Sequence, residues 1–325
     1  MTAPAATAAR PIEASLAYLN EAVAAAAAVE AAQQLGVLAR LDSGPVTVAE
    51  LADTCAISER GARLLLAALA GLGLAEGVGG GVWRAAVSDL AGLAGMPRMW
   101  AHLEGSLREG RPLVRGDTSD GAAAFYPGAV AYLGTMLAAI AEQAASQLPA
   151  AARVLDAGAG AAPWSLAVAT RHPACLVTAV DLPTVVPATR RAVRAAGRER
   201  QFRFLAGDLF DVELERGAYD LAIAGNLCHL FDEATNRRLF GRLYDALRPG
   251  GTLAVMDVIP DEQPTPRWVA LYELGLLLRT ASGRVHPLAA YLGWLHDAGF
   301  EPPERHCLVS EVQAMLLVTH KPAGG

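Results

Sequence analysis

Apolar residues in the second half of the chain alternate between short continuous runs and helical spacing. The runs predict strands, with helices between them, over residues 153–157, 176–181, 202–206, 219–224 and 252–258. Further helices over 267–280 and 287–298 precede a terminal pair of strands over 305–310 and 314–320. Strands that alternate with helices predict an α/β fold with a doubly wound, mostly parallel sheet, here of seven strands. The short link within the final pair makes the last strand antiparallel.

The first part of the chain shows helical spacing that is interrupted near Gly36. Two shorter helices follow, because Thr47 and Ser58 each stand in an N-cap position and Glu50 completes a capping box with Thr47. Glycines within 73–85, flanked by short apolar runs, predict a hairpin. Three helices followed by a hairpin are typical of a winged helix-turn-helix module.

The residues of the helix predicted over 58–72 indicate whether that module binds DNA or packs against protein. A DNA-reading helix presents basic and amide side chains to the bases. Here Arg60 and Arg63 are followed by residues 64–68, which are all leucine or alanine and suit packing against protein. We therefore expect a dimerisation surface or a scaffold for a substrate lid, and no DNA binding.

These patterns predict four regions along the chain. They are a flexible tail (1–11), an α-helical winged-helix dimerisation domain (12–95), a helical connector that contributes to the substrate pocket (96–148) and the sheet domain (149–325). Breaks within the connector are expected at 110–112 and 126–128, where glycine and proline occur together.

Composition narrows the function classes. The chain has 325 residues, 53% hydrophobic and 18% charged, as is typical of a globular protein with a large core. A net charge of −6 without a lysine- or arginine-rich run argues against a nucleic-acid partner. The four cysteines form no C-x-x-C pair, and neither a signal-sequence pattern nor an apolar stretch of membrane-spanning length occurs near the N-terminus. We expect a cytoplasmic protein without a membrane partner.

A glycine turn follows the strand predicted over 153–157. Asp156, Gly158 and Gly160 give a tight strand-to-helix connection that lets a ligand approach the main chain closely. Many dinucleotide-binding enzymes share such turns, but their fingerprint has a third glycine where this chain has Pro163. Proline suits the first turn of a helix. The turn therefore speaks against a pyrophosphate ligand and against an NAD-dependent oxidoreductase.

Two acidic positions farther along indicate what the turn binds instead. Asp181 ends the second strand, where a carboxylate can accept both hydroxyls of a ribose. Asp208, between Gly207 and Leu209, follows the third strand, where its carboxylate can accept from an adenine amino group. Together these residues predict a site for an adenosine ligand that lacks a diphosphate.

With these motifs, residues 154–260 resemble the core of a class I S-adenosylmethionine-dependent methyltransferase, which has a Rossmann-like sheet. From about residue 12 onward, the chain is similar to bacterial natural-product and plant caffeate-type O-methyltransferases. The resemblance implies S-adenosyl-L-methionine as cofactor and a homodimer formed through the N-terminal domain. It places Gly158 at the methionine part, Asp181 at the ribose and Asp208 with Leu209 at the adenine. The expected cofactor-binding residues are Asp156, Gly158, Gly160, Asp181, Leu182, Gly207, Asp208, Leu209 and Asn226.

Methyl transfer to a hydroxyl group needs a base as well as a donor. The sulfonium is already activated, so the enzyme has to align the acceptor and remove its proton. The family places a catalytic histidine in the segment after the fourth strand, where this chain has His229. Asp257, in the fifth strand, occupies the place of the acidic residue that orients this histidine. We expect His229 to act as general base and Asp257 to orient it; helix capping by His229 is the alternative.

Three departures from the family pattern bear on this assignment. Many relatives carry aspartate where this chain has Leu230, and many plant members carry lysine where it has Gly225. Plant members also have a second orienting glutamate near the position of His286, which here orients the base, faces the substrate or caps a helix. No metal is expected, although His229, Asp257 and His286 have the donor types of a metal triad.

The acceptor pocket is expected between the connector and the helix over 267–280. Trp268, Tyr272 and Leu276 recur every four residues and share one face of that helix. The residues expected to line the pocket are Met99, Trp100, Leu103, Phe125, Trp268, Tyr272, Leu276 and His286. Such a pocket is broad and apolar, which suits an aromatic or polyketide-like small molecule.

The sequence thus predicts O-methylation of a hydroxyl group in a secondary metabolite. Methylation at carbon or nitrogen, and a non-methylating reaction on the same fold, are alternatives within the same cofactor class. A winged-helix regulator that senses an adenosine ligand is a more distant alternative.

Overall fold

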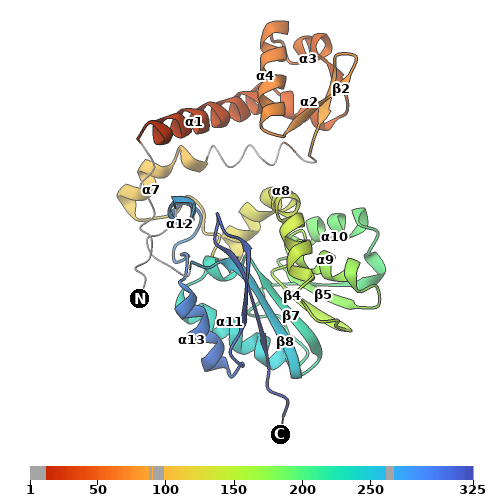
Figure 1. Ribbon diagram of the computed structural model, residues 1–325, viewed down its shortest axis with the longest axis vertical. Helices are drawn as coiled ribbons and strands as arrows, with labels where there is room; N and C mark the ends of the chain where they lie inside the picture. The colour runs from red at the N-terminus through yellow and green to blue at the C-terminus, as the bar shows by residue number, and fades with distance from the viewer. Residues whose placement is uncertain (1–11, 88–89, 91–98, 261–266, 325) are drawn as a thin grey trace, which may run out of the picture. The chain divides into compact units, whose positions relative to one another are not determined.

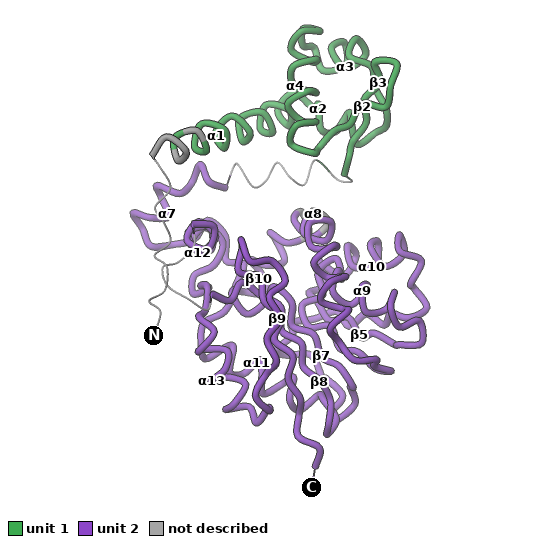
Figure 2. Tube along the Cα trace, in the orientation of Figure 1, with its two compact units in different colours: residues 1–98 green, residues 99–325 purple. Residues whose placement is uncertain are grey.

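Figure 2 divides the chain into two units, residues 1–98 and 99–325. The structure is a computed structural model that describes residues 12–87, 90, 99–260 and 267–324. The predicted tail and the predicted boundary near residue 95 lie outside these residues. From residue 99 onward, the predicted connector belongs to the same unit as the sheet.

The described residues of unit 1 form four helices and a small sheet. Its elements are α1 (Ile12–Gln34), α2 (Val37–Asp42), β1 (Val46–Thr47), α3 (Val48–Thr54), α4 (Glu59–Gly71), β2 (Ala75–Gly79) and β3 (Val82–Ala85). Gly36 adopts a φ of 76° between α1 and α2, and Thr47 and Glu50 form the predicted capping box of α3. The hairpin β2–β3 occupies the place of the predicted wing, with β1 added antiparallel to β3.

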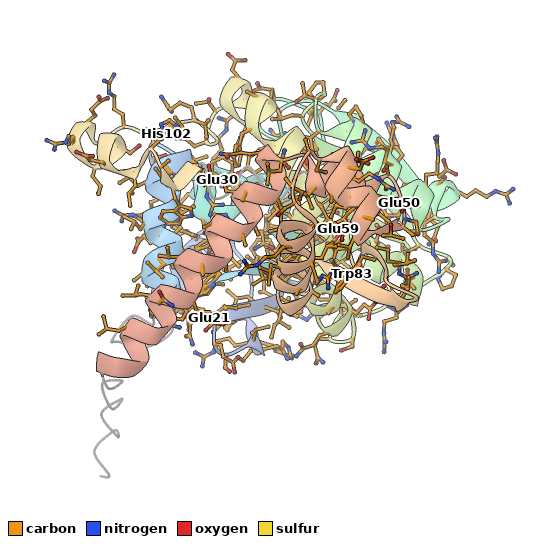
Figure 3. The ribbon with its side chains drawn as sticks, turned by 90° about the horizontal axis from the view of Figure 1, so that it is seen from above. Glu21, Glu30, Glu50, Glu59, Trp83 and His102 are labelled. Carbon is orange, nitrogen blue, oxygen red and sulfur yellow. The ribbon has the colours of Figure 1, made fainter. Side chains whose placement is uncertain are left out.

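Helix α4 buries one face and exposes the other. Ala62, Leu66 and Leu69 are fully buried in the core of unit 1, whereas the side chain of Leu64 is largely exposed. Ser58 caps the helix by accepting from the amide of Gly61. Figure 3 shows this unit from above, with the starts of α3 and α4 marked by labelled glutamates.

Unit 2 is built on one seven-stranded sheet (Figure 1). Its strands are β4 (Arg153–Ala157), β5 (Leu176–Asp181), β6 (Phe202–Ala206), β7 (Tyr219–Gly225), β8 (Leu247–Val258), β9 (Glu304–Val309) and β10 (Ala314–His320). Their order is β6-β5-β4-β7-β8-β10-β9, with the first five parallel and β10 antiparallel to both neighbours. The predicted doubly wound sheet is confirmed. The strand order reverses beside β4, and ligands bind at the carboxyl ends of strands at such a point.

Helices cover both faces of this sheet. The helices described in unit 2 are α7 (Leu103–Glu109), α8 (Ser119–Ala145), α9 (Pro163–Arg171), α10 (Val186–Ala195), α11 (Glu233–Ala246), α12 (Arg267–Arg279) and α13 (Leu288–Ala298), with 3₁₀ turns η1 (Glu199–Gln201) and η2 (Cys228–Leu230). Successive residues of β8 pack on opposite faces: Val255 contacts the core formed with α11 and α13, and Met256 the core formed with α8 and α9. Among the helices described, none is long and apolar enough to cross a membrane.

Two features differ from the sequence prediction by more than two residues. The predicted break at 126–128 is wrong, because α8 continues through it as one helix of 27 residues. Proline in a helix interior removes a backbone hydrogen bond, yet here the helix is capped by Thr118 and packs along α9. Tertiary packing therefore outweighs the local preference. Strand β8 begins at Leu247, before the predicted start at residue 252, because Leu247 pairs with Tyr219 of β7.

Candidate active site

The glycine turn joins β4 to α9 at the carboxyl edge of the sheet. Gly158 and Gly160 have φ angles of 71° and 56°, in the left-handed region that glycine adopts without strain. A Cβ on Gly158 would lie 3.0 Å from Leu227, and a Cβ on Gly160 would lie 3.3 Å from Val130. The hydroxyl of Thr189 donates to the Gly160 carbonyl at 2.6 Å. Close packing and this hydrogen bond hold the turn in one conformation.

A cavity of about 400 Å³ opens beside the turn. Seven of the nine expected cofactor-binding residues line it, namely Gly158, Gly160, Asp181, Leu182, Asp208, Leu209 and Asn226. Asp156 lies buried in β4 and Gly207 directly precedes Asp208. The connector was expected to contribute to the substrate pocket, but sequence reasoning missed Tyr126, Val130 and Leu133 of α8, which line the cavity. The strand ends thus bring the expected residues together, and α8 covers them.

Asp181 presents its carboxylate at the end of β5. One oxygen accepts from the amide of Gly160 at 2.6 Å and the other from the amide of Leu182 at 2.7 Å. Each oxygen keeps acceptor capacity for a further hydrogen bond. Burial raises the pKa of Asp181, and the two amide hydrogen bonds oppose this effect. This is a carboxylate with room to accept the two hydroxyls of a ribose.

Asp208 lies in the loop after β6 and is contacted from α8. Its carboxylate accepts from the amide of Phe210 at 2.7 Å and from the hydroxyl of Ser119, the first residue of α8. The N-terminus of α8 is thereby joined to the loop in which the resemblance places the adenine.

Asn226 carries a buried polar atom that the protein leaves unsatisfied. The residue has a φ of 53° just after β7, and its amide donates to the carbonyl of Met256 at 2.7 Å. Its side-chain oxygen is buried and has no hydrogen-bond partner. Such an atom costs about 1–3 kcal/mol, and the ammonium group in the methionine part of S-adenosylmethionine would satisfy it. The residues present therefore fit this cofactor.

Asp156 lies in β4 below the turn. Its carboxyl is 1% exposed and accepts from the hydroxyl of Ser165 in α9. Burial raises its pKa to about 7, although the hydrogen bond from Ser165 works in the opposite direction. Asp156 thus ties the start of α9 to the strand and carries a proton over much of the acidic range.

This proton makes stability depend on pH. An unfolded aspartate has a pKa of about 3.9, so above it the unfolded chain releases a proton that the folded chain keeps up to about pH 7. The stability contributed by protonated Asp156 is complete below the unfolded pKa and is lost as pH rises toward 7. From pH 5 to pH 8 we expect a loss of about 3 kcal/mol. Urea unfolding measures it, and Asp156→Asn should flatten the dependence. The same slope in both proteins would contradict the assignment.

Gly225 ends β7 against the ring of Trp164. A Cβ on Gly225 would lie 2.3 Å from two atoms of that ring, and both residues line the cavity. The indole therefore occupies the space that a side chain at position 225 would need. This accounts for glycine where plant relatives carry lysine.

Gly225→Ala should therefore destabilise the protein by about 1–3 kcal/mol through overpacking. In a double-mutant cycle with Trp164→Leu, the combined cost should be smaller than the sum of the single costs. Gly241→Ala on α11, with nothing within 4 Å of its added Cβ, is the matched control and should not be destabilising. Additive costs in urea unfolding would show that the two residues do not compete for space.

His229 and Asp257 form a buried pair beside the cavity. The Nδ1 atom of His229 lies 2.6 Å from Oδ1 of Asp257, and the His229 amide donates to Oδ2 at 3.2 Å. The two side chains are only 4% and 0% exposed. His229 belongs to η2, directly after β7, and the next residues, Leu230 and Phe231, line the cavity.

Hydrogen bonds stabilise the ionised form of Asp257. Besides His229, the amide of Val258 donates at 2.8 Å and the hydroxyl of Tyr291 at 3.2 Å. Burial alone would raise the pKa of Asp257, but attraction to His229 and the hydrogen bonds from His229 and the Val258 amide hold it below its usual value. An ionised Asp257 keeps the proton on Nδ1 of His229 and leaves Nε2 as the basic atom.

Of the expected acceptor residues, Tyr272 is the one that reaches this pair. Its hydroxyl lies 2.9 Å from Nε2 of His229, and its ring stacks on Trp268 with centroids 4.9 Å apart. Leu276, by contrast, is fully buried in a small core with Val258 and Val269.

None of the eight expected acceptor residues is among those that line the cavity. Met99 is buried, and Trp100 packs over Gly275 of α12. Leu103 begins α7, and Phe125 makes an edge contact with the ring of Tyr126. Trp100 therefore lies beside α12, and Phe125 belongs to α8.

His286 lies in an aromatic cluster behind η2. Its Nε2 donates to the carbonyl of Phe231 at 2.9 Å, and its ring contacts Trp294 with centroids 4.8 Å apart. Burial lowers the pKa of His286. Within the part of the chain that the structure describes, no three histidine, cysteine or acidic side chains gather as metal ligands.

The chain is similar to known methyltransferases. Residues 131–301 match the family described as the O-methyltransferase domain. The tetracenomycin polyketide synthesis 8-O-methyl transferase TcmO of Streptomyces glaucescens is 29% identical, over 84% of this chain and 87% of its own. The N,N-dimethyltransferase OxyT of Streptomyces rimosus is 25% identical, over 95% of this chain and 96% of its own.

A solved structure shares the fold over nearly the whole chain. Human N-acetylserotonin methyltransferase, in complex with S-adenosylmethionine, superposes with a TM-score of 0.75 and 24% identity, covering 98% of this chain and 99% of that one. The family match spans more than half of the present sequence and includes most of the residues that line the cavity, together with the His229–Asp257 pair. The chain therefore belongs to the O-methyltransferase family and is an S-adenosylmethionine-dependent methyltransferase.

Proposed function

We propose that the enzyme transfers the methyl group of S-adenosylmethionine to a hydroxyl group of a small aromatic or polyketide-like molecule. The observation that carries this proposal is the buried contact of 2.6 Å between His229 and Asp257 at the end of the sheet where the cavity opens. An imidazole held by a carboxylate is suited to remove the proton of a hydroxyl acceptor.

The cofactor is held by residues at the ends of successive strands. Asp181 accepts from the ribose hydroxyls, Asp208 with Leu209 contacts the adenine, and Gly158 with Asn226 faces the methionine part. The orphaned side-chain oxygen of Asn226 and the acceptor capacity of Asp181 support this arrangement. The bound cofactor supplies an electrophilic methyl group.

His229 then acts as general base and Asp257 keeps it oriented. A phenol has a pKa of about 10, so the loss of its proton at neutral pH needs such a base. A positioned base contributes on the order of 10²–10⁴-fold to the rate, and alignment of acceptor and donor contributes up to roughly 7–11 kcal/mol. The buried donors to Asp257 keep it ionised, which stabilises the imidazolium that forms.

The acceptor class rests on the lining and on the relatives. Tyr126, Val130, Leu133, Leu230 and Phe231 give the cavity a mostly apolar wall. TcmO is named for a polyketide, and the human structural neighbour is named for N-acetylserotonin, an aromatic hydroxyl compound. The expected residues near α12, Trp268 and Tyr272, would extend the same wall.

A second candidate is methylation at nitrogen. It is favoured by OxyT, a relative of similar length that is named as an N,N-dimethyltransferase. An amine needs less help from a base than a phenol does, because its neutral form already carries the attacking lone pair. The buried His229–Asp257 pair therefore favours oxygen.

We also propose that unit 1 forms a homodimer interface, as expected for this family. Helix α1 exposes large apolar side chains at Leu16, Leu19 and Val23, which recur every three to four residues. A cytoplasmic location stays a prediction from the sequence.

The test of this function is transfer of label from S-adenosyl-[methyl-¹⁴C]methionine to a set of hydroxynaphthoates, naphthols, N-acetylserotonin and arylamines. We expect labelled, extractable products with at least one hydroxyl acceptor and none with its methyl ether. Label transfer to arylamines alone would contradict the proposal, as would a complete lack of transfer by a protein that binds S-adenosylhomocysteine.

A further inference from the structure

The protein leaves little access to Nε2, the basic atom of His229. His229 is 3% exposed and does not line the cavity, whereas Leu227, Leu230 and Phe231 around it do. Its Nδ1 atom is committed to Asp257, so only Nε2 can receive a proton. The hydroxyl of Tyr272 lies 2.9 Å from that atom. An acceptor in the cavity therefore meets a base whose receiving atom already has a partner.

The direction of this hydrogen bond follows from its partners. Because Nδ1 carries the imidazole proton toward an ionised Asp257, Nε2 is a hydrogen-bond acceptor. Tyr272 must then donate its hydroxyl proton to Nε2. The phenol oxygen keeps its lone pairs free to accept a hydrogen bond from another hydroxyl group.

Tyr272 is held in place from several sides. Its ring is nearly parallel to Trp268, with an angle of 13° between the planes, and the guanidinium of Arg279 lies 4.9 Å from its centroid. Val258 and Leu276 pack around it in a buried core. Displacing the ring would lose all these contacts, so movement away from His229 is costly.

Tyr272, like His229, is not among the residues that line the cavity, but its neighbours reach the cavity wall. Tyr126 lines the cavity, and Arg279 and Tyr272 lie near enough for their charges to act on its pKa. A Cβ on Gly116 would lie 2.6 Å from the carbonyl of Arg279 and 3.7 Å from the hydroxyl of Tyr126. The C-terminal end of α12 and the cavity wall therefore meet at this point.

Arg279 provides a positive charge beside the phenol. The described residues give its guanidinium no carboxylate partner, and its Nε is buried without a hydrogen bond. Burial raises the pKa of Tyr272, and the neighbouring Arg279 lowers it. A negative charge that develops on the phenol oxygen would thus be stabilised from α12 itself.

We propose that Tyr272 is a catalytic proton relay between the acceptor hydroxyl and His229. This proposal rests on the proposed function, in which His229 is the base. The acceptor oxygen bonds to the methyl carbon as the carbon–sulfur bond breaks and its electron pair moves to sulfur. The acceptor proton moves to the Tyr272 oxygen, and the Tyr272 proton moves to Nε2 of His229. Tyr272 is restored as a neutral phenol, and the imidazolium later loses its proton to water.

The experiment compares Tyr272→Phe with the wild type and with His229→Asn, using the best hydroxyl acceptor of the labelling assay. We expect Tyr272→Phe to lower kcat by about 10²-fold, with the acceptor KM changed less than about threefold. The double variant should be no slower than His229→Asn alone, because both act on one proton path. Tyr244→Phe, a tyrosine that packs on Phe300 outside the cavity, is the control and should keep wild-type rates.

The outcomes separate the two proposals. If Tyr272→Phe is as fast as the wild type or faster, Tyr272 merely covers the base and the relay is wrong. If His229→Asn keeps wild-type activity, the proposed function itself fails, whatever Tyr272→Phe does.

A measurement without any acceptor tests the relay independently. In ¹⁵N-histidine-labelled protein, Nε2 of His229, assigned by its loss in His229→Asn, should have the shift of an unprotonated, hydrogen-bonded nitrogen. That shift should move in Tyr272→Phe and not in Tyr244→Phe. A proton found on Nε2 in the neutral imidazole would overturn the relay.

Discussion

His229→Asn should lower kcat for a hydroxyl acceptor by about 10²–10⁴-fold, the contribution of a positioned general base. The asparagine amide can still donate to Asp257, so the buried carboxylate keeps a partner in place of the Nδ1 contact of 2.6 Å. The basic Nε2 atom, however, is lost. Steady-state methyl transfer at saturating cofactor measures the effect.

Two controls show whether a lower kcat in His229→Asn comes from the loss of the base or from another effect of the substitution. S-adenosylhomocysteine should bind His229→Asn with nearly wild-type affinity, because His229 does not line the cavity where the cofactor is proposed to bind. His296→Asn, at an exposed histidine of α13, should leave kcat unchanged. A kcat within threefold of wild type in His229→Asn would remove His229 from the reaction.

Asp181→Asn should weaken the binding of S-adenosylhomocysteine by roughly 10²-fold, which is about 3 kcal/mol. Hydrogen bonds to a charged group contribute about 1.5–3 kcal/mol each, and the ribose offers two hydroxyls to this carboxylate. An asparagine also presents an NH₂ group to one of the two amides that the carboxylate now accepts from. Isothermal titration calorimetry measures the change without an acceptor.

The control for this prediction is Asp220→Asn. Asp220 also accepts from two backbone amides, those of Ala152 and Arg153, but at the start of β4, the opposite edge of the sheet from the glycine turn. Its substitution should leave the affinity for S-adenosylhomocysteine unchanged. Equal affinities for Asp181→Asn and wild type would place the ribose elsewhere.

The sheet was predictable because its strands are covered on both faces. Strands of that kind are continuous apolar runs between turn residues, and the predicted bounds of β4, β5, β6 and β10 coincide with the observed ones. The same topology places Asp181, Asp208 and Asn226 at one edge, since each follows or ends a parallel strand. The cofactor part of the candidate site therefore follows from local pattern and strand order.

The way in which α8 covers this site was not predictable from the local sequence pattern. Glycine and proline at 127–128 indicated a break, but α8 continues and packs so closely on the glycine turn that a Cβ on Gly134 would lie 2.6 Å from that of Ala161. The contact of Ser119 with Asp208 joins residues far apart in the sequence. Such contacts depend on how the helix packs, and no spacing within the sequence encodes them.

The role of individual side chains around the base was predictable only in part. The four-residue spacing placed Trp268, Tyr272 and Leu276 on one helix face, yet Leu276 is buried in a core and Tyr272 contacts His229. The sequence left three interpretations of His286 open, because its partner, the carbonyl of Phe231, is a backbone group. Because every residue has a backbone carbonyl, the sequence does not identify such a partner.

Identifying the atom that receives the methyl group tests the central claim, O-methylation with His229 as base, most directly. The probe is 5-amino-1-naphthol, which offers a hydroxyl and an amine on one aromatic frame, incubated with the enzyme and S-adenosyl-[methyl-¹³C]methionine. The ¹³C shift of the product distinguishes an aryl methyl ether from an N-methylamine. We predict the methyl ether, formed by wild type and lost in His229→Asn. An N-methyl product that persists in His229→Asn would contradict the account.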